Sequence, residues 1–363
     1  MIQTFSSTIR RKEMDAVLTC MVDEKIGPGE LNARLIQTVK EFFSCSGAVA
    51  LRSPAIALRY ALKALDLPKE SSIMLSALAP SWQILAVEEL GYKPLVLDVD
   101  ETTGLVTADA VSEGMKNGGR LLLLHESMGI VPDIKAILAL EIPVIEDISQ
   151  SAGAIYAEQE SADADEPASG TEGAKPEGVA KKTGSFGSFT ILGLEEHDII
   201  TGGGGAVLMA PGRREWLVLK KFTDEAPETD LLPDINSALA WVQLKEYPRN
   251  EMVRKEMFAL YQRSLMSGKN KTFVRDADEG SAAWSFPVVL NGALKDVKQY
   301  TNRKEIEIIP AFEKSVIALR DEELSSVCRH AKSLLLRCVL FPLYPRLGKA
   351  QTMKIAKVLG TLP

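Results

Sequence analysis

The chain has 363 residues, of which 46% are hydrophobic and 25% charged, and its 42 basic and 49 acidic residues give a formal net charge of −7. This is the composition of a globular protein long enough for two domains, and an acidic chain without a basic cluster is not expected to bind nucleic acid. The sequence has no apolar run of about 18 residues, so no membrane segment is predicted. Residues 1–15 lack the apolar core of a signal peptide, and we expect a cytoplasmic protein.

The cysteines and histidines do not predict a metal site. The four cysteines are scattered without a Cys-x-x-Cys spacing, which favours free buried thiols over disulfides. His125 and His330 have no cysteine or acidic partner at the spacing that metal ligands need. Core or surface roles are therefore expected for both histidines.

Strand-like and helical segments alternate through the first half of the chain. Because strands that alternate with helices form parallel sheets with crossover helices, an α/β fold is predicted. The helix that starts after residue 52 has Ser53 as a suitable N-cap and Pro54 at its first position, where a missing N–H has no cost. The expected strands are residues 48–52, 72–78, 93–98, 120–125 and 143–147.

The pattern changes twice further along the chain. Residues 158–182 are rich in Ala, Gly, Glu, Asp and Pro, and we expect a mobile acidic insertion there. A long helix over residues 238–266, interrupted near Pro248, precedes a further strand and several helices. We predict a large α/β domain of residues 1–245 and a smaller α+β domain of residues 246–363.

Several segments in a fixed order carry a resemblance to a known family. They are VIEDISQSAGA and GSFGSFTILGLEEHDIITGGGGAV in the middle of the chain, SPAIALRYALKALDL, APSWQILAVEELGYKPLVLDVD and LLLLHESMGIVPDIKAI before them, and LLPDINSALAWVQLKEYP and CVLFPLYPRL after them. These segments resemble the DegT/DnrJ/EryC1/StrS family of nucleotide-sugar aminotransferases. The resemblance implies a fold-type-I PLP-dependent transferase, with a large domain around a mostly parallel sheet and a smaller C-terminal domain. It also implies a homodimer, since the family builds each active site from two chains.

The residue that departs most from the family pattern is His197. It aligns with the lysine that forms the Schiff base with pyridoxal phosphate (PLP), and no other lysine lies between Lys182 and Lys220. Imidazole cannot form that Schiff base, so transamination through this lysine is not expected. The following Gly202–Gly205 lacks the spacing of a nucleotide-binding loop and is read as a turn.

Three other residues match the positions that bind the cofactor ring in the family. The resemblance implies that Asp147 holds the pyridinium proton, that Gln150 contacts the face or the phenolic oxygen of the ring, and that Trp82 stacks on it. Ordinary structural roles stay open for Asp147, as a helix cap, and for Trp82, as a core residue.

The phosphate-binding positions are less well matched. After Ser53, the family's Gly-Thr is replaced by Pro54 and Ala55, which removes a backbone donor and a hydroxyl. The family's strand-end serine aligns with Gly193, and its cross-subunit asparagine with Thr229. Because each hydrogen bond to a charged acceptor contributes about 1.5–3 kcal/mol, we expect PLP or its amine form, pyridoxamine phosphate (PMP), to bind weakly or not at all.

Three functions remain open, all of them linked to deoxysugar or polysaccharide synthesis. The first is a family member that has lost lysine-based transamination. The second is a PMP-dependent 3-dehydratase of nucleotide-linked sugars, a branch in which a histidine at this position acts as a base. The third is a protein that binds a nucleotide-linked sugar, or a partner protein, without turnover.

Overall fold

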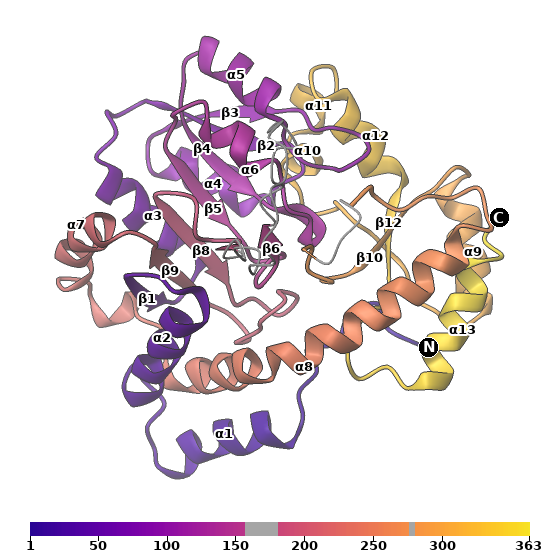
Figure 1. Cartoon of the computed structure of the whole chain (residues 1–363), viewed down its shortest axis with the longest axis horizontal. Helices are drawn as coiled ribbons and strands as arrows, with labels where there is room; N and C mark the ends of the chain where they lie inside the picture. Colours follow the sequence, from indigo (N-terminus) through magenta and orange to yellow (C-terminus); the bar gives the residue numbers. More distant parts are fainter. Residues whose placement is uncertain (157–180, 276–279) are drawn as a thin grey trace, which may run out of the picture.

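The structure is a computed structural model that describes residues 1–156, 181–275 and 280–363. Its first part is built around a seven-stranded sheet of order β1-β9-β8-β5-β4-β2-β3 (Figure 1). Strands β3, β2, β4, β5 and β8 are parallel, whereas β9 is antiparallel to both β8 and β1. The strands are β1 (Gly47–Leu51), β2 (Ser72–Ser76), β3 (Lys93–Leu97), β4 (Gly119–His125), β5 (Val144–Asp147), β8 (Phe189–Gly193) and β9 (Ala206–Ala210). The predicted α/β fold with a mostly parallel sheet is confirmed.

Both faces of this sheet are buried under hydrophobic cores. In β4, Leu122 and Leu124 belong to one hydrophobic core, while Leu121 and Leu123 belong to the core on the opposite face. Successive side chains of a strand point to opposite faces, so a run of leucines suits a strand that is covered on both sides. The helices that supply these two cores include α2 (Glu30–Phe43), α5 (Ala108–Lys116), α6 (Ile134–Leu138) and α8 (Asp234–Leu265) on one face and α3 (Pro54–Leu65), α4 (Trp82–Glu89) and α7 (Arg213–Thr223) on the other.

A smaller antiparallel sheet of order β10-β12-β11 forms the C-terminal part. A separate core packs this sheet against the second half of α8, and Ile2 from the N-terminus belongs to that core. The strands are β10 (Phe286–Val289), β11 (Ile309–Pro310) and β12 (Cys338–Phe341). The helices are α9 (Leu294–Arg303), α10 (Val316–Leu319), α11 (Asp321–Leu324), α12 (Arg329–Arg337) and α13 (Lys349–Leu359).

Helix α8 connects the two parts (Figure 1). It is a single helix of 32 residues that contains Pro248, so the predicted interruption is wrong. Pro248 is exposed, and on the solvent side the carbonyl that loses its N–H partner can be hydrated. The predicted domain division at residue 245 falls inside this helix.

The remaining elements are short or peripheral. Helix α1 (Arg11–Val22) packs on α8, and β6 (Ile155–Tyr156) pairs with β7 (Lys181–Lys182). Apart from these two lysines, the insertion predicted at residues 158–182 lies outside the described residues. Within the described parts of the chain, no helix is both long and apolar enough to cross a membrane.

Candidate functional site

Three adjacent parallel strands end in residues that face the same edge of the sheet. His125 ends β4, Asp147 ends β5 and Gly193 ends β8, and the register pairs His125 directly with Asp147. Ligands of open α/β sheets bind at the carboxyl ends of the strands. The site is therefore built at this edge.

Asp147 is completely buried and hydrogen-bonded through both of its oxygens. Oδ2 accepts from Gln83 Nε2 at 2.7 Å and lies 2.9 Å from His125 Nδ1, while Oδ1 accepts from the backbone N–H of Ser149 at 3.1 Å and from its hydroxyl. Burial by itself would raise the pKa of this carboxyl, but His125 and the hydrogen bonds from Ser149 outweigh it and hold the pKa below its ordinary value. Asp147 is thus an ionised carboxylate whose roughly four lone-pair positions are all in use.

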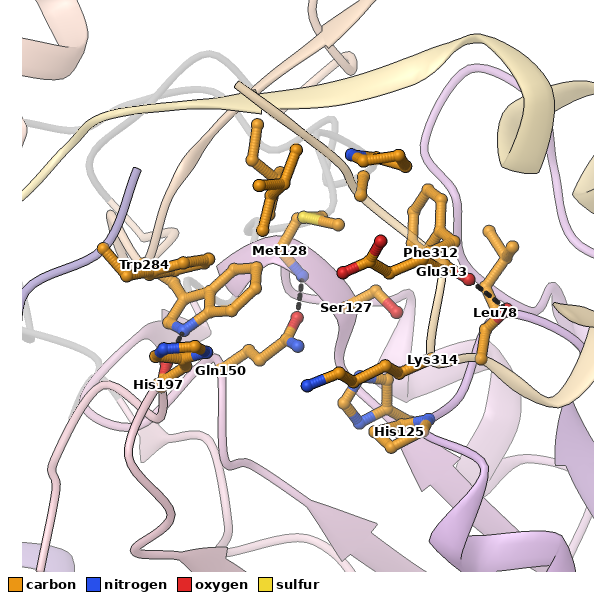
Figure 2. A pocket seen from close by; sticks show the side chains of 17 residues that line it. Leu78, His125, Ser127, Met128, Gln150, His197, Trp284, Phe312, Glu313 and Lys314 are labelled. Atoms are coloured by element: carbon orange, nitrogen blue, oxygen red, sulfur yellow. Dashed lines mark hydrogen bonds between the residues drawn. The ribbon is translucent and has the colours of Figure 1, made fainter. Parts of the chain in front are cut away.

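A pocket of about 170 Å³ lies between this edge and the C-terminal part. It is smaller than the ~300–1,000 Å³ typical of small-molecule sites, so it has room for about one ring. In the view of Figure 2, His197 and Trp284 lie on the left, Leu78 lies on the right, and His125 and Lys314 lie low in the view. Ser127 and the amide of Gln150 lie nearer the centre. The complete lining is Phe5, Leu78, Pro80, His125, Ser127, Met128, Gln150, His197, Trp284, Ile309, Pro310, Ala311, Phe312, Glu313, Lys314, Ser315 and Leu340.

His197 is packed against aromatic side chains. Its ring stacks on Phe5 with centroids 4.4 Å apart and an interplanar angle of 12°, and its carbonyl accepts from Trp284 Nε1 at 2.7 Å. The side chain keeps 47% of its surface exposed, and its Nε2 lies 4.0 Å from a carboxylate oxygen of Glu196. The imidazole is therefore oriented by Phe5 and accessible from the pocket.

The other residues predicted from the sequence fall into two groups. Gln150 lines the pocket, where its Oε1 accepts from the backbone N–H of Met128 at 2.8 Å. Ser53, Ala55, Trp82, Gly193 and Asp147 are not among the lining residues. Trp82 packs against the core under α3 and α4, and its stacking on a cofactor ring stays a prediction.

A second acid stands beside Asp147 at the end of β8. A Cβ atom added to Gly193 would collide with Asp198 Oδ2 and would lie 2.5 Å from Ser149 Oγ. Burial, together with the negative charges of Asp147 and Glu195, raises the pKa of Asp198 to about 8, although the N–H of Glu195 opposes this shift. The missing side chain of Gly193 is thus replaced in space by a carboxyl group.

The start of α3 offers an anion few donors. Pro54 has no N–H, and the N–H of Ile56 donates to Ser53 Oγ at 3.2 Å, which confirms Ser53 as the N-cap. Of the first three helical residues, only Ala55 keeps an unused N–H for a ligand. In this arrangement the site does not fit a phosphorylated pyridine ring. The carboxyl groups of Asp147 and Asp198 lie in it, the start of α3 has few free N–H donors, and both oxygens of Asp147 are already hydrogen-bonded.

Two buried glutamates interact with each other at β4 and β5. Glu126 follows β4 and Glu146 is in β5; Glu146 accepts from the backbone N–H groups of Gly184, Phe186 and Gly187. Burial raises the pKa of both carboxyls, and the charge of Glu146 raises the pKa of Glu126 further. The pair connects the loop before β8 to the segment that carries Ser127.

Sequence reasoning missed the lining residues that come from distant segments. Phe5 lies 192 positions before His197 (197 − 5), and Lys314 lies 117 positions after it (314 − 197). Neither residue belongs to a recognisable motif. Only the packing of the C-terminal part onto the sheet edge brings them into the pocket.

A mostly parallel sheet with crossover helices, a small C-terminal sheet and a pocket at the carboxyl edge define a fold-type-I PLP-transferase architecture. The model of the DegT/DnrJ/EryC1/StrS aminotransferase family matches residues 7–360. The chain therefore belongs to this family.

Solved structures of low sequence identity share the fold. An aminotransferase from Psychrobacter cryohalolentis is 17% identical, with a TM-score of 0.81 over 98% of this chain and 97% of that one. A mutant GDP-4-keto-6-deoxymannose-3-dehydratase with bound GDP-perosamine is 15% identical, with a TM-score of 0.82 over 99% of this chain and all of that one (100%). Another structure of such a 3-dehydratase, also 15% identical with a TM-score of 0.81 over 99% and 100% of the two chains, contains a trapped PLP-glutamate geminal diamine.

Proposed function

We propose that this chain acts in the metabolism of nucleotide-linked deoxysugars, binds the sugar part of its ligand in the pocket, and does not transaminate through a lysine at position 197. The observation that carries this proposal is the hydrogen-bond arrangement around Asp147. Gln83, His125 and Ser149 occupy both of its oxygens, which leaves no lone pair for a pyridinium proton. Weak or absent binding of PLP and PMP follows.

The lining of the pocket suits a sugar ring. Trp284, Phe5 and Phe312 offer aromatic surface, against which the C–H groups of a sugar can pack. Ser127 and Gln150 offer hydroxyl and amide groups to its hydroxyls. Because the pocket holds about one ring, the nucleotide of such a ligand would lie outside it.

Parallel titrations test the proposal. PLP, PMP and a GDP-linked or dTDP-linked 6-deoxysugar are added separately to the protein, and binding is followed by calorimetry and by tryptophan fluorescence, to which Trp284 contributes. The sugar nucleotide is expected to saturate, whereas neither cofactor form saturates up to millimolar concentration. Micromolar binding of PLP or PMP would overturn the proposal.

A second candidate is a 3-dehydratase in which His197 is the general base. It is favoured by the position of His197, whose half-exposed ring lines the pocket, and an imidazole accepts protons well near neutral pH. The test is the consumption of a 4-keto-6-deoxysugar nucleotide in the presence of PMP. Turnover by the wild type and its loss in His197→Asn would establish this function in place of the first.

We also propose a homodimer that lies in the cytoplasm. One face of α1 exposes Met14, Leu18, Met21 and Val22, each at least 50% accessible, and a contiguous apolar surface of this kind is typical of an interface. Light scattering should give twice the chain mass, and Leu18→Glu combined with Met21→Glu should give the monomer.

The proposed location in the cytoplasm is supported by the four cysteines, which are buried free thiols, as expected in a reducing compartment. Cell fractionation tests the location.

A further inference from the structure

The pocket contains a lysine that is not at position 197. The backbone carbonyl of Lys314 accepts from the N–H of Ser81 at 2.9 Å, and the neighbouring Ser315 forms a bridge with Pro80. These bonds attach residues 314 and 315 to the segment that follows β2. The backbone of Lys314 is thereby held at the rim of the pocket.

The ammonium group of Lys314 does not help to stabilise the fold. Figure 2 shows its nitrogen directed into the pocket, on the side of the His125 ring. Among the residues that the structure describes, no hydrogen bond or ion pair to Lys314 Nζ is formed, although Glu313 is its chain neighbour. A lysine in a ligand pocket without an ionic partner is free to interact with what binds there.

His125 is held in this pocket by its hydrogen bond to Asp147. Asp147 is an ionised acceptor, so His125 Nδ1 must carry the proton of their 2.9 Å hydrogen bond. In the neutral ring the lone pair then lies on Nε2. A nucleophile whose nearby base is oriented by a third group is the arrangement that activates side chains for covalent chemistry.

Ser127 provides an independent sign that the pocket is built for a polar ligand. Ser127 is 1% exposed and lines the pocket, and its buried hydroxyl finds no hydrogen-bond partner in the described part of the chain. The next residue, Met128, has a φ of 59°, a left-handed conformation that costs energy in a residue other than glycine. A buried hydroxyl without a partner also has a cost, which a ligand hydroxyl or carbonyl would remove.

We infer that Lys314 is the reactive amine of this pocket and forms an imine with the carbonyl group of a keto-sugar or of another hydroxylated aldehyde or ketone. The sugar identity rests on the proposed function, whereas the imine does not. His125 takes a proton from the Lys314 ammonium, and the amine nitrogen attacks the carbonyl carbon. The carbonyl oxygen takes up the two hydrogens of the attacking amine and leaves as water, so that a C=N bond replaces the C=O bond with no net oxidation or reduction.

Reductive trapping tests this inference. The full-length protein is incubated with dihydroxyacetone and sodium cyanoborohydride, and the modified lysines are located by peptide mass spectrometry. Lys314 is itself exposed, and it is expected to be labelled at least about a hundredfold faster than other exposed lysines such as Lys298, the lower end of what a positioned base contributes. Lys314→Arg keeps the positive charge and should lose this label, while the control Lys298→Arg should keep it.

The proposed role of His125 as the base for Lys314 is tested by the rate and the pH dependence of the labelling. His125→Gln should slow the labelling of Lys314 and change its pH dependence without moving the label to another lysine. Uniform labelling of surface lysines in the wild type would overturn the inference, whatever the behaviour of the variants. Labelling of Lys314 without any binding of a sugar nucleotide would support the imine and refute the proposed function. Binding of a sugar nucleotide without preferential labelling of Lys314 would support the proposed function and refute the imine.

Discussion

Asp147 Oδ2 and His125 Nδ1 lie 2.9 Å apart at the ends of two adjacent parallel strands, and both side chains are buried. The carboxylate that the family resemblance assigned to a cofactor ring is thus bound to a histidine of its own chain. The remaining donors come from Gln83 and Ser149. This arrangement gives Asp147 a structural role that can be measured without any ligand.

Asp147→Asn is expected to reduce the free energy of unfolding by about 3–5 kcal/mol, because it leaves buried donors without their anion. The pKa of Asp147 is depressed in the folded state, so its contribution is present above the unfolded pKa of about 3.9 and is lost as the pH falls through the folded value. Urea denaturation at pH 7 and at pH 3 measures both effects. The exposed Asp15→Asn serves as control and should stay within about 0.5 kcal/mol of the wild type; equal effects in the two variants would contradict the prediction.

Asp198→Asn should stabilise the protein at pH 8. Between the unfolded pKa of about 3.9 and the folded value of about 8, folded Asp198 keeps a proton that the unfolded chain releases. Stability therefore falls as the pH rises through this range. Asparagine does not titrate, so the variant should gain about 1–3 kcal/mol at pH 8 and show a flatter profile of Tm against pH between 5 and 8. A variant as pH-dependent as the wild type would refute this reason.

Gly193→Ser should destabilise the chain by about 1–3 kcal/mol through overpacking. The new Cβ would collide with Asp198 Oδ2 and press on Ser149 Oγ. Adding Asp198→Ala should recover part of the loss, with a coupling energy of about 0.5–3 kcal/mol in a double-mutant cycle. Gly27→Ser is the matched control, since nothing lies within 4 Å of its Cβ position. Additive effects of the two changes at the site would show that the carboxyl group does not fill this space.

His197→Lys should not create a PLP enzyme. The substitution returns the amine, but Asp147 stays saturated and the start of α3 stays poor in donors. Absorbance spectroscopy with added PLP should show no saturable Schiff-base band, and borohydride trapping should not modify position 197 in preference to other lysines. A tight yellow complex of the variant would mean that the histidine is the only defect.

Phe5→Leu should loosen His197 with little effect on the fold. Phe5 stacks on the imidazole and contacts Trp284 at a centroid distance of 5.5 Å, and aromatic pairs contribute about 0.5–1.5 kcal/mol beyond their buried area. Tryptophan emission should shift, and the NMR signals of the His197 ring should broaden or move. Phe222→Leu, on the opposite side of the sheet, should leave these signals unchanged.

Local sequence signals predicted the framework well. Each of the five early strands begins within one residue of the expected position, and Ser53 caps its helix as proposed, because alternation and capping depend on residues that are close in sequence. The uninterrupted passage of α8 through Pro248 was not predicted. The helix continues because Pro248 lies on its solvent-exposed side, and the local sequence pattern does not reveal which side is exposed.

The sequence by itself determined the family, the α/β fold and the absence of a lysine at position 197, since these depend on motif order and local periodicity. Tertiary structure alone decided what surrounds His197 and which side chains occupy Asp147. Phe5, Trp284 and Lys314 reach the pocket from segments far apart in the chain, and Gln83 and His125 reach Asp147 across neighbouring strands and helices. The first set of contacts follows from how the C-terminal part packs on the sheet edge, and the second from the order of the strands and helices in the large sheet. Neither can be read from the residues that are next to these positions in the sequence.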